Sequence, residues 1–157
     1  MELNALTAIA PVDGRYRRVT QPLAQYFSEF GLIRYRVLVE VEYLIYLAEI
    51  PLPQLENKID AQAKQALRDI VANFSLADAE TIKTTEKTTN HDVKAVEYFV
   101  KEKLQGLGLQ DISEFVHFGL TSQDINNTAI PLSLKEGIQA QLLPQLQSLI
   151  GLLNERA

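Results

Sequence analysis

A polar junction and the helix that follows it occupy residues 84–104, TTEKTTNHDVKAVEYFVKEKL. Four hydroxyls, an amide, an imidazole, an ammonium group and two carboxylates fall within residues 84–92. The apolar residues that follow recur at the spacing of an amphipathic helix, at Val93, Val96, Val100 and Leu104. We therefore expect a helix to begin near Val93, with Asn90, His91 and Asp92 at its N-terminus.

This junction suits a ligand as well as a helix cap. Either Asn90 or Asp92 can cap the helix, because a short side-chain oxygen accepts from the unpaired backbone N–H groups of the first turn. Those N–H groups also attract anions. Capping alone would explain Thr, Asn and Asp before a helix, but the density of polar groups around His91 makes this junction the best candidate site.

Composition indicates an ordinary soluble protein of 157 residues, 46% hydrophobic and 22% charged. The absence of cysteine excludes disulfides, thiolate catalysis and cysteine-ligated metals, and we expect a cytoplasmic location. No export signal or membrane-spanning window is recognisable. The net charge of −5 argues against a nucleic-acid surface.

Helical patterns run through most of the chain, and strand signals are nearly absent, so we predict an all-α fold. The first helix is expected over residues 22–49, with a bend at Gly31, and its charged residues Arg34, Arg36, Glu40 and Glu42 are expected to face away from its apolar side. A second helix is expected over residues 60–74, and a short helical piece over residues 113–118. Between them, Ser75 is expected to cap another helix, with Asp78 completing a capping box. A structural, hydrogen-bonded role is expected for His117.

A second polar junction, GLTSQDINNT, occupies residues 119–128. Thr121 or Ser122 can cap the helix that begins there, and Asp124 falls in its first turn. Asn126 and Asn127 are unusually polar for a helix interior unless they face a cavity or a partner. Two such junctions in one small domain suggest two walls of one pocket.

The two ends of the chain carry further signals. Residues 11–16, PVDGRY, indicate a turn that can present Arg15 and Tyr16 as a carboxylate or phosphate clamp, although a solvated basic turn would look the same. Near the C-terminus, Pro131 and Pro144 predict a kink or break. Beyond them an apolar stripe at positions 142, 146, 149 and 153 stops in mid-pattern, so we expect it to pack on further sequence or on other subunits.

Taken together, the turn and the two junctions closely resemble the bacterial type of the adenylosuccinate lyase family, within the fumarase/aspartase superfamily. The resembling segments are residues 11–16, residues 88–99 (TTNHDVKAVEYF) and residues 115–127 (FVHFGLTSQDINN), in this order. The resemblance covers nearly the whole chain, which corresponds to about the first third of such an enzyme. Pro131 departs from the pattern of the family.

The resemblance implies an N-terminal helical domain over residues 1–120 and the start of the central helical bundle over residues 121–157. It implies a homotetramer whose active sites draw residues from three subunits, and a reaction that eliminates fumarate from adenylosuccinate without a metal or other cofactor. The main catalytic histidine and the serine base of the family lie beyond Ala157, so we expect this chain alone to be inactive.

Carried over position by position, the resemblance assigns a role to each candidate residue. Arg15 and Tyr16 would contact the phosphate end of the nucleotide. Asn90, His91 and Asp92 would form a wall facing the substrate, with His91 supporting proton transfer to the leaving group. Thr121 and Ser122 would bind a substrate carboxylate.

Two alternative interpretations remain open at this stage. An argininosuccinate, aspartate or fumarate lyase would share the fold and the second junction but would bind no phosphate, so neutralising Arg15 would leave its substrate affinity intact. A helical interaction module without chemistry would tolerate replacement of Asn90, His91 and Ser122.

Overall fold

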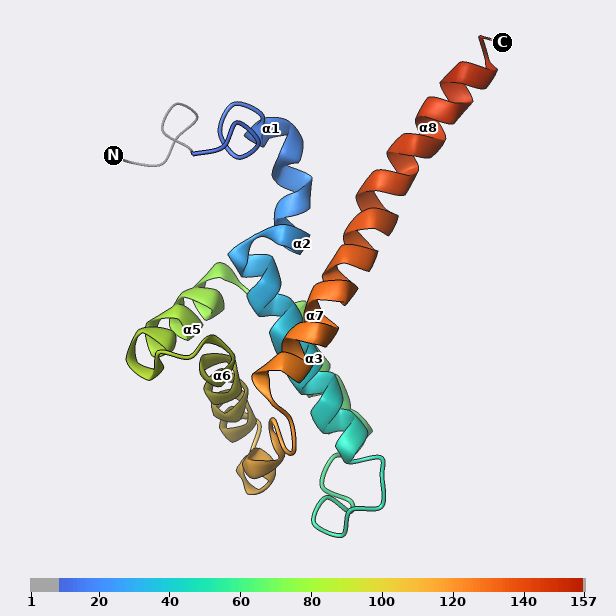
Figure 1. Cartoon of the computed structure of the whole chain (residues 1–157). Coiled ribbons are helices and arrows are strands. Elements are labelled where there is room, and N and C mark those ends of the chain that lie inside the picture. The colour runs from blue at the N-terminus through green and yellow to red at the C-terminus, as the bar shows by residue number, and fades with distance from the viewer. Residues whose placement is uncertain (1–8, 157) are drawn as a thin grey trace. The chain divides into compact units, whose positions relative to one another are not determined.

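A computed structural model describes residues 9–156, and within them the chain is helical with no β-strand (Figure 1). This confirms the predicted all-α class. None of the described helices has both the length and the hydropathy required to cross a bilayer. The chain divides into two compact units, Leu32–Leu132 and the pair of segments Met1–Gly31 and Ser133–Ala157. The domain boundary between residues 120 and 121 stays a prediction.

The unit Leu32–Leu132 carries both polar junctions on helices that share one apolar core. Its elements are most of α3 (Glu29–Leu47), α4 (Ala61–Ala72), α5 (Leu76–Thr89), α6 (Asp92–Gly106), η2 (Gln110–Phe115) and the first part of α7 (Ser122–Gly137). The core includes residues that the helical spacing predicts to face inward, Val37, Val41, Leu44, Leu67, Val96, Val100 and Leu104, and also Ile125. Burial of these residues holds the helices that present the junctions.

The first helix is shorter than the sequence predicts. Short pieces, α1 (Arg17–Thr20), η1 (Gln21–Leu23) and α2 (Ala24–Phe27), precede α3, and the chain breaks at Ser28, where the backbone is extended (φ −82°, ψ 169°). The Ser28 hydroxyl accepts from the Gly31 N–H at 3.1 Å, so Ser28 caps α3. A Cβ at Gly31 would meet the Gln25 carbonyl oxygen at 2.8 Å, so glycine is needed there for close packing rather than for a bend.

The two late prolines behave differently from each other. Helix α7 continues through Pro131, so the helix does not break there, and a kink at Pro131 stays a prediction. A π-helical segment, η3 (Ile138–Leu142), then leads into α8 (Leu143–Asn154), with Pro144 in its first turn, where a missing N–H is tolerated. The apolar side chains of α8, among them Leu146, Leu149 and Leu153, are exposed.

The capping box predicted at the start of α5 is present and gives a stability test. The Ser75 hydroxyl accepts from the Asp78 N–H at 3.2 Å, and the Asp78 carboxylate accepts from the Ser75 N–H at 2.9 Å. We expect Ser75→Ala to lower the free energy of unfolding by about 1 kcal/mol, because it leaves an N–H of the first turn unpaired. Urea unfolding followed by circular dichroism measures this loss.

Thr81→Ala on the same helix is the matched control, since the Thr81 hydroxyl donates only to the Ala77 carbonyl one turn earlier. Its expected change is within about 0.5 kcal/mol. Equal losses in the two variants would show that the hydroxyl of Ser75 has no special role as a cap.

Candidate active site at two helix N-termini

At the first junction, α5 ends and α6 begins within two residues. Asn90 adopts the left-handed conformation (φ 51°) and ends α5, with its N–H donating to the Glu86 carbonyl. Asparagine tolerates that conformation better than most residues, and the chain needs it to turn between the helices. Asn90 therefore does not cap α6, and neither does Asp92, which lies inside its first turn.

The cap of α6 is His91, which the sequence did not suggest. Its backbone is extended (φ −150°, ψ 112°), and its Nδ1 accepts from the Lys94 N–H at 3.0 Å. Because Nδ1 is an acceptor, the neutral imidazole carries its proton on Nε2. That Nε2 lies 3.2 Å from the Ser122 hydroxyl oxygen, so His91 donates a hydrogen bond to Ser122. The structure thus brings the two predicted junctions together.

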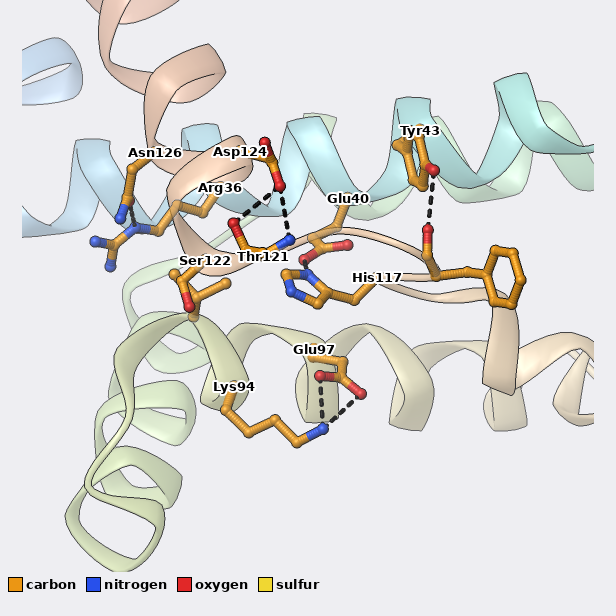
Figure 2. A network of polar contacts seen from close by, with 12 residues as sticks. Arg36, Glu40, Tyr43, Lys94, Glu97, His117, Thr121, Ser122, Asp124 and Asn126 are labelled. Atoms are coloured by element: carbon orange, nitrogen blue, oxygen red, sulfur yellow. Dashed lines mark hydrogen bonds and ion pairs between the residues drawn. The ribbon is translucent and has the colours of Figure 1, made fainter.

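The second junction places hydroxyls at the N-terminus of α7. The Thr121 N–H and hydroxyl both donate to Asp124 Oδ2, at 2.7 and 2.9 Å (Figure 2). These two hydrogen bonds hold the pKa of Asp124 below its usual range. Ser122 is the first residue of α7, and Asp124 occupies the first turn as predicted.

Asp92 is held at both of its carboxylate oxygens. Oδ1 accepts from the Val93 N–H at 2.8 Å, and Oδ2 pairs with Arg36 Nη2 at 2.7 Å. Burial raises the pKa of Asp92, but the Val93 N–H, the Arg36 guanidinium and His91 outweigh it and leave that pKa below its usual range. Asp92 is therefore a fixed, ionised carboxylate beside the His91 imidazole.

Two charged residues of α3 are buried, so the expectation that they face away from the apolar side of the helix is wrong for them. Arg36 is 5% exposed and Glu40 is fully buried. Arg36 Nε donates to Asn126 Oδ1 at 2.9 Å, and Glu40 Oε1 lies 2.6 Å from His117 Nδ1 (Figure 2). One feature of the sequence could have indicated their burial. Positions 36 and 40 are one helical turn apart, and Val37, which lies between them, is buried.

His117 lies in a turn rather than in the short helix predicted over residues 113–118. The 3₁₀ segment η2 ends at Phe115, and His117 adopts the left-handed conformation with φ 62°. Tyr43 on α3 donates its hydroxyl to the Phe118 carbonyl at 2.9 Å, which fixes the same turn (Figure 2). The contact with Glu40 agrees with the structural, hydrogen-bonded role expected for His117.

Arg15 and Tyr16 belong to the other unit, so their part in a common site stays a prediction. The turn itself is present, with the Asp13 and Gly14 N–H groups donating to the Ala10 carbonyl. The Arg15 guanidinium carbon lies 5.4 Å from the centroid of the Tyr16 ring, and half of the Tyr16 surface is exposed. The pair is thus open to a ligand.

The junctions together offer proton donation and anion binding. An imidazole N–H, hydroxyls and the N-termini of α6 and α7 meet where His91 contacts Ser122. Among residues 9–156, no group of three or more histidine and acidic side chains is arranged to hold a metal ion.

Comparison with known proteins identifies the family. A family described as "Lyase" matches residues 14–157. The chain is 54% identical over 156 residues to an adenylosuccinate lyase of Dictyostelium discoideum, covering 96% of this chain and 33% of that protein. It is 49% identical over 158 residues to an adenylosuccinate lyase of Vibrio cholerae, covering 100% of this chain and 35% of that protein.

An adenylosuccinate lyase of Escherichia coli K12 is 49% identical over 151 residues, covering 96% of this chain and 33% of that protein. The chain therefore spans about a third of the length of the curated relatives that it matches. The family match covers most of the chain, and the described residues have the all-helical fold of the fumarase/aspartase type. The chain belongs to this lyase family.

Proposed function

We propose that this chain is the N-terminal part of an adenylosuccinate lyase, a C–N lyase of purine biosynthesis. The enzyme would eliminate fumarate from adenylosuccinate to give AMP, and from the succinyl-carboxamide ribotide precursor. The observation that supports this most is the His91–Ser122 contact, made by two helix N-termini in a chain about half identical to relatives of that name. The chain alone would be inactive, because the main acid and base would lie outside it.

The elimination has three steps, and the residues of this site would assist the last of them and bind the substrate. A base removes a proton from the carbon beside a carboxylate, the C–N bond breaks with its electron pair moving to nitrogen, and an acid protonates that nitrogen. The Nε2–H of His91 supports the last transfer. Thr121 and Ser122 bind a substrate carboxylate at the N-terminus of α7, where the helix dipole favours negative charge.

Asn90 and Asp92 form the wall beside His91, and Arg15 with Tyr16 binds the nucleotide phosphate. The full-length enzyme is a cytoplasmic homotetramer, uses no metal or cofactor, and divides this chain into an N-terminal domain, residues 1–120, and the start of the bundle, residues 121–157.

The direct test supplies adenylosuccinate to the full-length protein and follows loss of its absorbance together with the appearance of fumarate. Release of fumarate supports the proposal. If adenylosuccinate stays intact, argininosuccinate and aspartate are the next substrates to supply, because lyases of this superfamily that act on them would share the fold. No turnover with any of them would favour the interaction module.

Arg15→Gln tests whether Arg15 binds the phosphate of adenylosuccinate. We expect it to raise KM for adenylosuccinate by roughly 10- to 100-fold, because a charge-assisted hydrogen bond to a phosphate contributes about 1.5–3 kcal/mol. Initial rates over a range of substrate concentrations give the value. Arg18→Gln removes the same charge from the same segment and should leave KM within about threefold. An unchanged KM for Arg15→Gln would show that Arg15 does not bind the phosphate.

A further inference from the structure

A closed ring of polar contacts joins three helices of the unit Leu32–Leu132. From α3, Arg36 reaches Asp92 on α6 through Nη2 at 2.7 Å and Asn126 on α7 through Nε at 2.9 Å. His91, next to Asp92, then contacts Ser122, one helical turn before Asn126, at 3.2 Å. The region around α6 and the helix α7 are thus connected twice, once through Arg36 and once through the His91–Ser122 contact.

The chemistry of arginine suits this place in the ring. A guanidinium is planar, and its donors point in fixed directions, so one group can orient two acceptors at a set angle. The Arg36 side chain is only 7% exposed, so packing limits its freedom to adopt other rotamers. Its two acceptors belong to different helices, and each lies beside a candidate catalytic or binding residue.

We propose that Arg36 is a positioning residue that sets the distance between His91 and Ser122 by holding Asp92 and Asn126 on one guanidinium. This inference rests on the proposed elimination and assigns a residue to it that does not contact the reacting atoms. Displacing α7 from α6 by a fraction of an ångström misplaces the Nε2–H of His91 relative to a carboxylate bound at Ser122. Such a displacement slows the proton transfer more than it weakens binding, because many other groups also bind the substrate.

Arg36→Lys in the full-length enzyme is the main test. Lysine keeps the positive charge but has no planar fork, so it cannot hold both acceptors at the same angle. We expect kcat to fall roughly 10-fold or more while KM stays within about threefold. Asn126→Ala removes one limb of the ring and keeps a good helix former, so we expect a similar fall. The double variant should lose little more than either single variant, since both break one ring.

Arg68→Lys is the matched control, because Arg68 makes the same kind of fork to Glu42, at 2.7 and 2.9 Å, outside the ring. We expect its kcat to stay within twofold of wild type. Crystal structures give a readout that needs no turnover. The separation of His91 Nε2 and Ser122 Oγ should exceed about 3.5 Å in Arg36→Lys and remain a hydrogen bond in Arg68→Lys.

Several results would overturn the role of Arg36. They are wild-type kcat in Arg36→Lys, a parallel loss of kcat in Arg68→Lys, additive losses in the double variant, or an unchanged His91–Ser122 separation. If Arg36→Lys fails to fold, Asn126→Ala alone decides, by the same kcat and crystallographic readouts. A wild-type enzyme inactive on adenylosuccinate would instead refute the proposed function, and the crystallographic comparison would still test Arg36.

Discussion

Replacing His91 with asparagine in the full-length enzyme should lower kcat for adenylosuccinate on the order of 10²-fold or more while α6 stays folded. General acid–base groups typically contribute 10²- to 10⁴-fold in rate, and asparagine cannot act as one. Its side-chain oxygen can nevertheless accept from the Lys94 N–H, as Nδ1 of His91 does at 3.0 Å. Asparagine is also among the preferred N-cap residues. The substitution therefore separates the chemistry of His91 from its role as a cap.

Two further variants complete this experiment. His91→Ala removes both the cap and the Nε2–H, so it should lose about as much kcat as His91→Asn and in addition about 1 kcal/mol of stability. His91→Gln removes the imidazole and gives a second measure of turnover. Fumarate release gives kcat, and thermal unfolding gives stability. Turnover at the wild-type level in His91→Asn would show that His91 is only part of the wall that faces the substrate.

Local patterns were sufficient to predict most of the helices and the positions of the two junctions. The capping box of Ser75 and Asp78 depends on residues three apart, and the core face of α6 depends on a single period, so both can be determined from a short segment. The likeness of the two junctions suggested that they are two walls of one pocket, and the structure does bring them into contact at His91 and Ser122. The pocket itself stays a prediction.

The features that were missed depend on partners distant in sequence. Charged residues on a helix are expected to face solvent unless paired, and nothing near Arg36 in sequence shows that Asn126, 90 residues away, lies opposite. The same holds for Glu40, whose partner His117 is 77 residues away. The capping assignment failed for another reason: Asn90, Asp92 and His91 can all accept an N–H, and the turn between α5 and α6 decides which one does.

The second large effect is expected at Glu40, the most deeply buried charged residue described. Its Oε1 lies 2.6 Å from His117 Nδ1, and within residues 9–156 no hydrogen-bond partner is found for its Oε2. Glu40→Ala should lower the free energy of unfolding by about 3 kcal/mol, because it leaves a cavity in the core and removes the partner of the half-buried His117 imidazole. It should also lower kcat, since His117 holds the turn that leads to Thr121 and Ser122.

Glu40→Gln keeps the shape of the side chain and isolates the effect of its charge. Burial raises the pKa of Glu40, and the negative charge of the neighbouring Glu97 raises it further. The hydrogen bond and charge of His117 lower this pKa, but it stays above its ordinary value. Between the ordinary and the raised pKa, the folded protein holds a proton that the unfolded chain has released. Stability due to Glu40 is therefore complete below the ordinary pKa, near 4.3, and falls as the pH rises towards the raised one.

The stability of wild type relative to Glu40→Gln should consequently decrease with rising pH above about 4.3. Thermal unfolding of the two proteins over a pH series measures this difference. Carboxylates with lowered pKa values that do not interact with Glu40, such as Asp78 and Asp92, titrate in both proteins and cancel in the comparison. If the relative stability of wild type rose with pH instead, Glu40 would be stabilised as a carboxylate by His117 more strongly than burial penalises it, and the pair would act as a buried ion pair.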